Sequence, residues 1–146
     1  MRSIHARGRD NARTPMQWDG EAQAGFTEGT PWIKVNPNYV EINAQAELND
    51  DDSIFRYYQK LIQLRKDYEV IVKGDFELFL PEDPDLFIYT RTLEETILLV
   101  VANFHEKRVS LILPEKLQLR KECLICNYKD QEEGYLRPYE AAMYMV

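Results

Sequence analysis

The chain has 146 residues, of which 45% are hydrophobic and 29% are charged, and this suffices for one ordinary domain with a buried core. Its formal net charge of −7 argues against nucleic acid and against anionic membrane as partners, because both attract basic surfaces. No apolar run approaches the ~20 residues that a membrane-spanning helix needs.

The first eight residues, Met1–Gly8, are basic, but no apolar segment follows them. A secretion signal carries such a segment directly after its basic residues. We therefore expect no secretion signal in this stretch and predict a cytoplasmic location.

The segment with the most unusual composition is Arg9–Asp19, which reads Arg-Asp-Asn-Ala-Arg-Thr-Pro-Met-Gln-Trp-Asp. It shows no apolar periodicity of 3.6 or 2, which predicts an ordered loop. Arg9 and Arg13 carry planar guanidinium forks that suit bidentate hydrogen bonding to carboxylates or to neighbouring hydroxyls. Trp18 offers a flat apolar face that packs a loop or stacks on a sugar ring. The residue types alone leave a binding loop and a structural clamp equally favoured.

Residues 9–52 as a whole are expected to be poor in regular structure. Breakers recur along them, at Gly20, Gly25, Gly29, Pro31 and Pro37. A loop of this length is uncommon in a compact domain and usually has a function or a missing context. We expect its aromatic rings to anchor it by burial, and an exposed platform for sugars is the alternative. These rings are Trp18, Phe26, Trp32 and Tyr39.

A helix is predicted over residues 53–67. The acidic run Asn49–Ser53 precedes it, and acidic side chains cap free backbone N–H groups and favour the positive end of the helix dipole. Apolar residues then recur with the spacing of one helix face. They are Ile54, Tyr57, Tyr58, Leu61 and Ile62.

From Glu69 onward the pattern changes to short β-rich runs separated by acidic turns. The runs are Val70–Val72, Phe76–Leu80, Leu86–Arg91, Ile97–Ala102, Val109–Leu113, Glu122–Ile125 and Ala142–Val146. Short strands at nearly regular spacing predict an antiparallel β-sandwich rather than βαβ units.

Cys123 and Cys126 have the CxxC spacing that zinc and redox sites use. No second CxxC accompanies them, and residues three apart on a strand point to opposite faces. We expect two reduced, mostly buried thiols. The carboxylates at 50–52 and 130–133 lack the alternating spacing of calcium loops, so no metal and no cofactor is expected.

Four segments together resemble the α-amylase-type glycoside hydrolases, and within them the oligo-1,6-glucosidase and dextran glucosidase branch. They are Arg9–Asp19, Ala24–Phe26, Pro31–Tyr39 and Asp52–Lys66. Trehalose-6-phosphate hydrolases and sucrose isomerases are near relatives of that branch.

The resemblance implies a mainly β fold in two parts. Residues 1–68 would be a remnant of the catalytic (β/α)8 barrel, with the active-site loop at 9–52 and the last barrel helix at 53–67. Residues 69–146 would form a C-terminal antiparallel β-sandwich domain. A complete barrel takes roughly 250 residues, so the barrel in this chain is incomplete.

The same resemblance assigns no catalytic residue to this chain. The catalytic carboxylates of the family lie earlier in its sequences, and their motifs are absent here. Arg13 matches the family arginine that lines the pocket for the terminal glucose, and a salt bridge that holds the loop is the alternative role. Arg9 and Asp10 are expected to orient the loop, whereas Gln17 and Trp18 are expected to pack.

We therefore predict the C-terminal portion of an α-glucosidase that acts on α-1,6 or related bonds of oligosaccharides, a portion that lacks the catalytic carboxylates and is inactive alone. A small carbohydrate-binding β-sandwich module and a non-catalytic subunit are the alternatives. Without a barrel, the apolar face of residues 54–62 would be bare and would favour self-association. The motif does not distinguish among isomaltose, dextran, trehalose 6-phosphate and sucrose as substrates.

Overall fold

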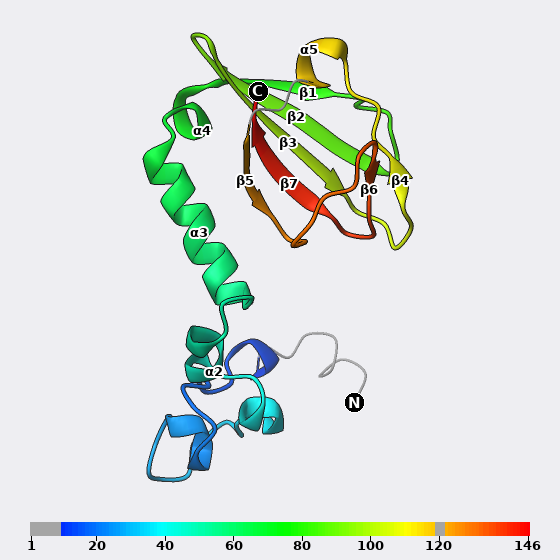
Figure 1. The fold of residues 1–146 in the computed structure, drawn as a ribbon. Coiled ribbons are helices and arrows are strands. Elements are labelled where there is room, and N and C mark those ends of the chain that lie inside the picture. Colours follow the sequence, from blue (N-terminus) through cyan, green and yellow to red (C-terminus); the bar gives the residue numbers. More distant parts are fainter. Residues whose placement is uncertain (1–9, 119–121) are drawn as a thin grey trace. The chain divides into compact units, whose positions relative to one another are not determined.

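The computed structural model describes residues 10–118 and 122–146 (Figure 1). The chain divides into two compact units, Met1–Tyr58 and Gln59–Val146, and each is described by itself. The division at residues 68 and 69 that the sequence suggests stays a prediction.

The first unit consists of irregular backbone interrupted by short helices. Three are 3-10 helices, η1 (Asp10–Ala12), η2 (Ala22–Gly25) and η3 (Pro37–Val40), and the fourth is the α-helix α2 (Ala44–Asn49). The segment is therefore poor in long regular elements, as expected, but α2 was not anticipated. Only six residues long, α2 is too short for a sequence periodicity to reveal.

Helix α3 (Ile54–Asp67) confirms the helix predicted over 53–67. Its cap differs from the expected one, because Ser53 and not an acidic residue caps it. The Ser53 hydroxyl accepts a hydrogen bond of 3.2 Å from the Arg56 amide and donates one of 2.6 Å to the Glu47 carbonyl. The Asp50 carboxylate instead accepts from the Asp52 amide, ahead of the helix.

The predicted apolar face of α3 is largely exposed in this chain. Ile54 is 82% exposed, Tyr58 64% and Ile62 45%, whereas Leu64 is buried. At 14 residues, α3 is also too short and too polar to cross a bilayer, and the same holds for every other helix in the described ranges.

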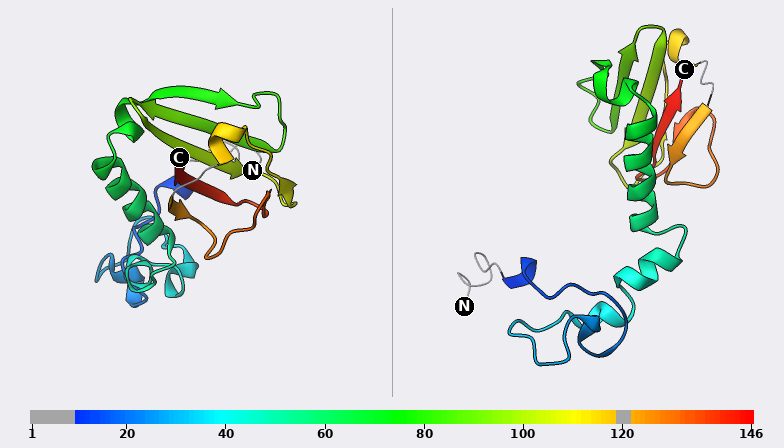
Figure 2. Two further views of the ribbon diagram at one scale, coloured as in Figure 1. Left: turned by 45° about the horizontal axis from the view of Figure 1, so that its top comes forward. Right: turned by 90° about the vertical axis from the view of Figure 1, so that its left-hand side faces the viewer.

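The second unit confirms the predicted antiparallel β domain. Five strands form one sheet in the order β1-β2-β3-β7-β5, and β4 and β6 form a second, two-stranded sheet (Figures 1 and 2). The strands are β1 (Asp75–Phe79), β2 (Leu86–Leu93), β3 (Thr96–Asn103), β4 (Val109–Ser110), β5 (Glu122–Cys126), β6 (Tyr135–Leu136) and β7 (Ala141–Met145).

One face of the five-stranded sheet carries the hydrophobic core. Ile88, Leu99 and Val101 from its central strands are fully buried there. The second sheet contributes Leu136, and the short helix α5 (Glu115–Gln118) contributes Leu117, to the same cluster. The inward residues of two sheets therefore share one core, as in a β-sandwich.

Two predicted runs need correction, and one strand was missed. The run Val70–Val72 is not a strand but part of helix α4 (Val70–Lys73). Backbone hydrogen bonds from Lys73 to Glu69 and from Gly74 to Val70 close its turn, and packing against β2 and β3 outweighs the β propensity of the run. Of the run 109–113 only Val109–Ser110 pairs as a strand, and β6 was missed because it has two residues.

The two cysteines are not joined in a disulfide, as expected, but they are not mostly buried. Cys123 is exposed and Cys126 is half-buried. A register shift between Cys123 and Ile125 makes a bulge in β5, and the consecutive residues Leu124 and Ile125 are both buried. The bulge therefore breaks the simple alternation on which the prediction rested.

Candidate functional site

The candidate binding residue, Arg13, directly follows η1. Its amide donates a hydrogen bond of 3.0 Å to the Asp10 carbonyl, and its side chain is exposed. Among the described residues the Arg13 guanidinium forms no ion pair, so no salt bridge engages it within that part of the chain. Its five donors are thus available to an acceptor outside these residues. Arg9, which was expected to orient the loop, lies outside the described residues.

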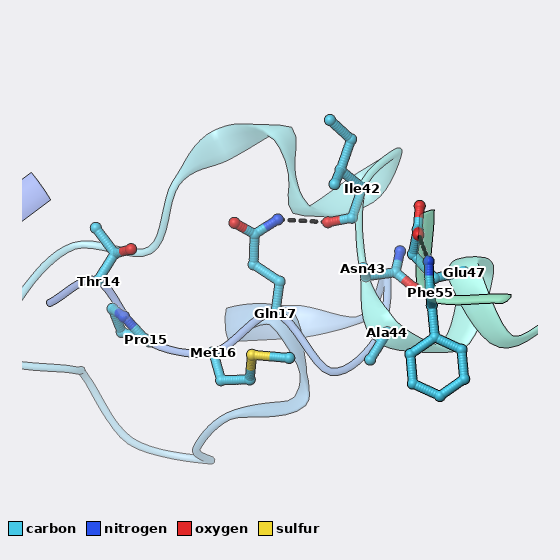
Figure 3. A pocket seen from close by; sticks show the side chains of 9 residues that line it. All are labelled: Thr14, Pro15, Met16, Gln17, Ile42, Asn43, Ala44, Glu47 and Phe55. Carbon is cyan, nitrogen blue, oxygen red and sulfur yellow. Dashed lines mark hydrogen bonds between the residues drawn. The ribbon is translucent and has the colours of Figure 1, made fainter. Parts of the chain in front are cut away.

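The backbone that follows Arg13 is tied to the start of α2. The Ala44 amide donates 2.9 Å to the Gln17 carbonyl, and the Gln45 amide donates 3.0 Å to the Trp18 carbonyl. The side-chain amide of Gln17 donates to the Ile42 carbonyl (Figure 3). Gln17 therefore connects the loop to the start of α2 through hydrogen bonds. This role is more specific than the packing expected of it.

Asn43 caps α2 and braces the chain before it. Its Oδ1 accepts from the Ala46 amide at 2.8 Å, and its Nδ2 donates to the Tyr39 carbonyl at 2.9 Å. The side chain is only 7% exposed, so both of its polar ends are satisfied inside the unit. Asn43 is not among the residues predicted from the sequence, although an asparagine directly before Ala44–Glu47 is a helix-start signal.

A tight turn closes the other end of the loop. The Trp18 amide donates 2.9 Å to the Ala24 carbonyl, and the Asp19 carboxylate accepts 2.9 Å from the Glu21 amide. Gly25 has φ of +65°, and a Cβ there would lie 2.7 Å from Cγ of Asp19. The turn therefore needs glycine at 25, both for its backbone angle and for the space beside the carboxylate.

A pocket of about 380 Å³ lies between the loop and α2 (Figure 3). It is lined by Thr14, Pro15, Met16, Gln17, Ile42, Asn43, Ala44, Glu47 and Phe55. Arg13 is not among these residues, although it precedes the first of them. The lining is mostly apolar, and its polar residues are Thr14, Gln17, Asn43 and Glu47.

The pocket holds one carboxylate, that of Glu47, and this group is already engaged. Its Oε2 accepts a hydrogen bond of 3.1 Å from the Phe55 amide at the start of α3. Retaining glycoside hydrolysis needs two carboxyl groups about 5 Å apart. The pocket can therefore hold part of a ligand, but it lacks the pair that would cleave one. Within residues 10–118 and 122–146, no cluster of His, Cys, Asp and Glu could hold a metal ion.

The aromatic rings of the loop are not buried anchors in this chain, contrary to expectation. Trp18 is 53% exposed, Phe26 48% and Trp32 91%, and Tyr39 is half-buried. The loop is held instead by the backbone and amide hydrogen bonds described above. Its rings therefore present apolar surface.

Two family models match this chain. The model described as alpha amylase, catalytic domain, matches residues 1–74, and the model described as alpha-amylase SusG C-terminal domain matches residues 86–142. The first match contains the loop, the pocket and helices α2, α3 and α4, and the second contains most of the β domain.

Curated relatives match the chain along its whole length. The oligo-1,6-glucosidase of Parageobacillus thermoglucosidasius is 51% identical over 100% of this chain and 27% of that protein. The oligo-1,6-glucosidase of Halalkalibacterium halodurans is 50% identical over 99% of this chain and 27% of that protein. The trehalose-6-phosphate hydrolase of Bacillus subtilis is 44% identical over 98% of this chain and 27% of that protein. The chain thus spans about a quarter of the length of these relatives.

Solved structures agree with these matches. Bacillus licheniformis trehalose-6-phosphate hydrolase superimposes with a TM-score of 0.88 at 44% identity, over 97% of this chain and 27% of that chain. Isomaltulose synthase from Klebsiella superimposes with a TM-score of 0.86 at 41% identity, over 94% of this chain and 25% of that chain.

Proposed function

Because this chain belongs to the α-amylase family and corresponds to the C-terminal part of its glucosidases, we propose that it serves as that part of an α-glucosidase. The assembled enzyme would hydrolyse α-1,6 or related α-glucosidic bonds of oligosaccharides. The observation that carries the proposal is the agreement along the whole chain with proteins named oligo-1,6-glucosidase.

In this proposal Arg13 contacts the sugar but performs no bond cleavage. The exposed guanidinium can hold two neighbouring hydroxyls, or a carboxylate that itself faces the sugar, with its planar fork. Backbone hydrogen bonds from α2 to the carbonyls of Gln17 and Trp18 fix the chain that follows Arg13. The Arg13 guanidinium would therefore be held by a restrained loop. The two catalytic carboxyl groups would come from the catalytic part of the enzyme that this chain does not contain.

The test compares the chain alone with the chain supplied with the missing part. We define the catalytic segment as the portion of the Parageobacillus thermoglucosidasius oligo-1,6-glucosidase that precedes the region matched by this chain. Glucose release from isomaltose is measured for the chain, for the catalytic segment, for their mixture and for a single polypeptide that joins them.

We expect no release by the chain alone above a control with Arg13→Ala, and clear release by the joined polypeptide. Hydrolysis by the isolated chain would contradict the proposal, and so would a joined polypeptide that folds but does not hydrolyse α-glucosides. Relative rates on isomaltose, dextran, trehalose 6-phosphate and sucrose would then assign the substrate.

A carbohydrate-binding role is the second candidate, and the exposed rings of Trp18 and Trp32 favour it. Calorimetric titration of the chain with isomaltose and dextran tests it, and the absence of binding heat would exclude it. The indole rings lie in the segment matched by the catalytic-domain model and not on the sandwich, which favours the first proposal.

Self-association through the exposed face of residues 54–62 remains part of the proposal. Ile54 and Tyr58 present apolar surface that a second copy can cover. Sedimentation of the chain over a range of concentrations tests this, and a constant monomer mass would refute it. The cytoplasmic location also stays a prediction, which cell fractionation can test.

A further inference from the structure

The two cysteines of β5 lie on either side of its bulge, and the pairing with β7 shows which way their side chains point. Cys123 lies opposite Tyr144, and Cys126 lies opposite Ala142. Residues directly opposite each other in an antiparallel pair share one face of the sheet. Tyr144 and Ala142 both belong to the hydrophobic core, so both cysteine side chains lie on the core side of β5. The bulge therefore brings to one face two residues that a regular strand would direct to opposite faces.

The two thiols differ in their access to solvent. Cys123 is exposed, whereas Cys126 is half-buried and packs against the core cluster. A small reagent in solution can reach an exposed thiol, and burial screens the other one from it. The pair thus has one thiol at which such a reagent can enter and a more protected thiol on the same face.

Two hydrogen bonds orient the sulfur of Cys126. It donates to Oε1 of Glu140 at 3.6 Å and accepts from the Tyr128 amide at 3.4 Å. Burial raises the pKa of the Cys126 thiol, and the negative charges of Glu140 and Cys123 raise it further, against the opposing effect of the Tyr128 hydrogen bond. Cys126 is therefore protonated at neutral pH, and its sulfur lies close enough to Cys123 to respond to the charge there.

The position of β5 in the sheet allows the backbone movement that would join the two sulfurs. A disulfide needs its Cβ atoms about 3.5–4.5 Å apart. β5 is an edge strand that pairs only with β7 (Figure 1), and its bulge already interrupts that pairing. An edge strand bends at a bulge at lower cost than a central strand, because fewer ladder hydrogen bonds oppose the movement.

We propose that Cys123 and Cys126 form a reversible dithiol–disulfide pair that exchanges with low-molecular-weight disulfides. The Cys123 thiolate attacks one sulfur of the small disulfide, whose S–S bond breaks and releases one small thiolate. Cys126 then loses its proton to water, and its sulfur attacks Sγ of Cys123 and displaces the second small thiolate. The two cysteines are oxidised to one disulfide, and the small disulfide is reduced to two thiols. The exchange requires no glucosidase activity.

Oxidation would also reach the ion pair that precedes β7. The Cys126 sulfur in a disulfide carries no proton, so Glu140 would lose its thiol donor. The donors from Arg137 to Glu140 would remain. The redox state of β5 is thereby coupled to a buried carboxylate of the β domain.

Thiol trapping followed by mass spectrometry tests the pair in the full chain. The reduced protein is mixed with oxidised glutathione, the reaction is stopped with acid, and the remaining thiols are alkylated. We expect both thiols to disappear together, leaving no glutathione on the protein and one peptide that holds both cysteines and lacks two hydrogen atoms. Excess reduced glutathione should restore both thiols. A glutathione adduct that persists on Cys123, a disulfide between two chains, or no reaction would each overturn the proposal.

Two cysteine variants separate the two steps, with circular dichroism to confirm that each is folded. In Cys126→Ser the glutathione adduct on Cys123 should last at least about tenfold longer than in the unchanged protein, because the second thiol is missing. Cys123→Ser should react at least about tenfold more slowly, because its remaining thiol is half-buried. Adducts of equal lifetime with and without Cys126 would contradict the second step.

A third variant tests the role of the buried carboxylate. Glu140→Gln removes a charge that raises the pKa of Cys126. The adduct on Cys123 should then disappear at least about twofold faster at neutral pH, because more of Cys126 is thiolate. Glu133→Gln, at an exposed position, is the matched control and should leave the lifetime unchanged. Equal lifetimes in both variants would count against Cys126 as the attacking sulfur.

Discussion

Nε of Arg137 donates a hydrogen bond of 2.9 Å to Oε2 of Glu140, whose carboxylate is only 1% exposed. The Arg137 amide donates to the same oxygen at 2.8 Å, and its guanidinium stacks 4.0 Å from the centroid of the Tyr128 ring. Nη1 of Arg137 also donates to the Asp130 carboxylate at 2.9 Å. One arginine thus joins a buried and an exposed carboxylate beside the start of β7.

Removing the buried charge tests how far this arrangement stabilises the β domain. Glu140→Gln keeps the shape of the side chain but replaces charge-assisted hydrogen bonds with neutral ones, so we expect a loss of roughly 1–3 kcal/mol in the free energy of unfolding. Urea denaturation followed by circular dichroism measures it. Glu133→Gln, at an exposed position, is the control and should change little.

The same carboxylate makes stability depend on pH. Burial alone raises the pKa of Glu140, but the hydrogen bonds and charge of Arg137 outweigh it and hold that pKa below the ordinary value of 4.5. A carboxyl whose pKa is lower in the folded state stabilises the fold above its unfolded pKa and loses this contribution as pH falls through the folded value.

We therefore expect the melting temperature to fall as the pH drops below about 4.5, and to fall less steeply in Glu140→Gln. Asp130, whose pKa the hydrogen bond and charge of Arg137 also lower, titrates in the same direction. Melting curves between pH 3 and pH 7 measure the slope. Identical slopes for both proteins would show that Glu140 does not carry the effect.

Gly25→Ala should loosen the turn that ends the Arg13 loop. An alanine at φ of +65° costs about 1–2 kcal/mol, and its Cβ would meet the Asp19 carboxylate. We expect faster hydrogen exchange at the amides of Trp18 and Glu21, which are bonded within this turn. Gly29→Ala, where a Cβ would make only an ordinary contact of 3.7 Å with Oγ1 of Thr27, is the matched control and should leave exchange unchanged.

Asn43→Ala should destabilise the connection between the loop and α2. The change removes the cap of the Ala46 amide and leaves the Tyr39 carbonyl without its donor, at a cost of about 1–2 kcal/mol. Hydrogen exchange at Ala46 reports the cap. Asn36→Ala removes a longer, exposed bond of 3.3 Å to the Asn38 amide, and a loss as large as that of Asn43→Ala would contradict the assignment.

Ile88→Ala should be the most destabilising of these changes. Ile88 is fully buried in the core between the two sheets, and its truncation costs about 2–5 kcal/mol. Ile112→Ala, at a position 77% exposed, should change the free energy of unfolding by less than about 0.5 kcal/mol. Chemical denaturation of both variants compares the two costs directly.

The sequence by itself determined the elements whose pattern is local and long. The apolar spacing from Ile54 to Ile62 predicted helix α3, and the β-rich runs predicted β1, β2, β3, β5 and β7. The composition of Arg9–Asp19 and the segments that accompany it likewise led to the family. A hydrophobic periodicity or a sequence motif can be recognised without knowledge of tertiary contacts, because it lies in residues that are neighbours along the chain.

Only the tertiary structure decided the features that depend on distant partners. Val70–Val72 reads as a strand, yet it forms α4, which packs against β2 and β3. The residues near Gln17 in the sequence do not predict its hydrogen bond to the Ile42 carbonyl. Those near Phe87 do not predict its ring contact with Phe104. Such contacts join residues far apart along the chain, and their energies become available only once the backbone has brought those residues together.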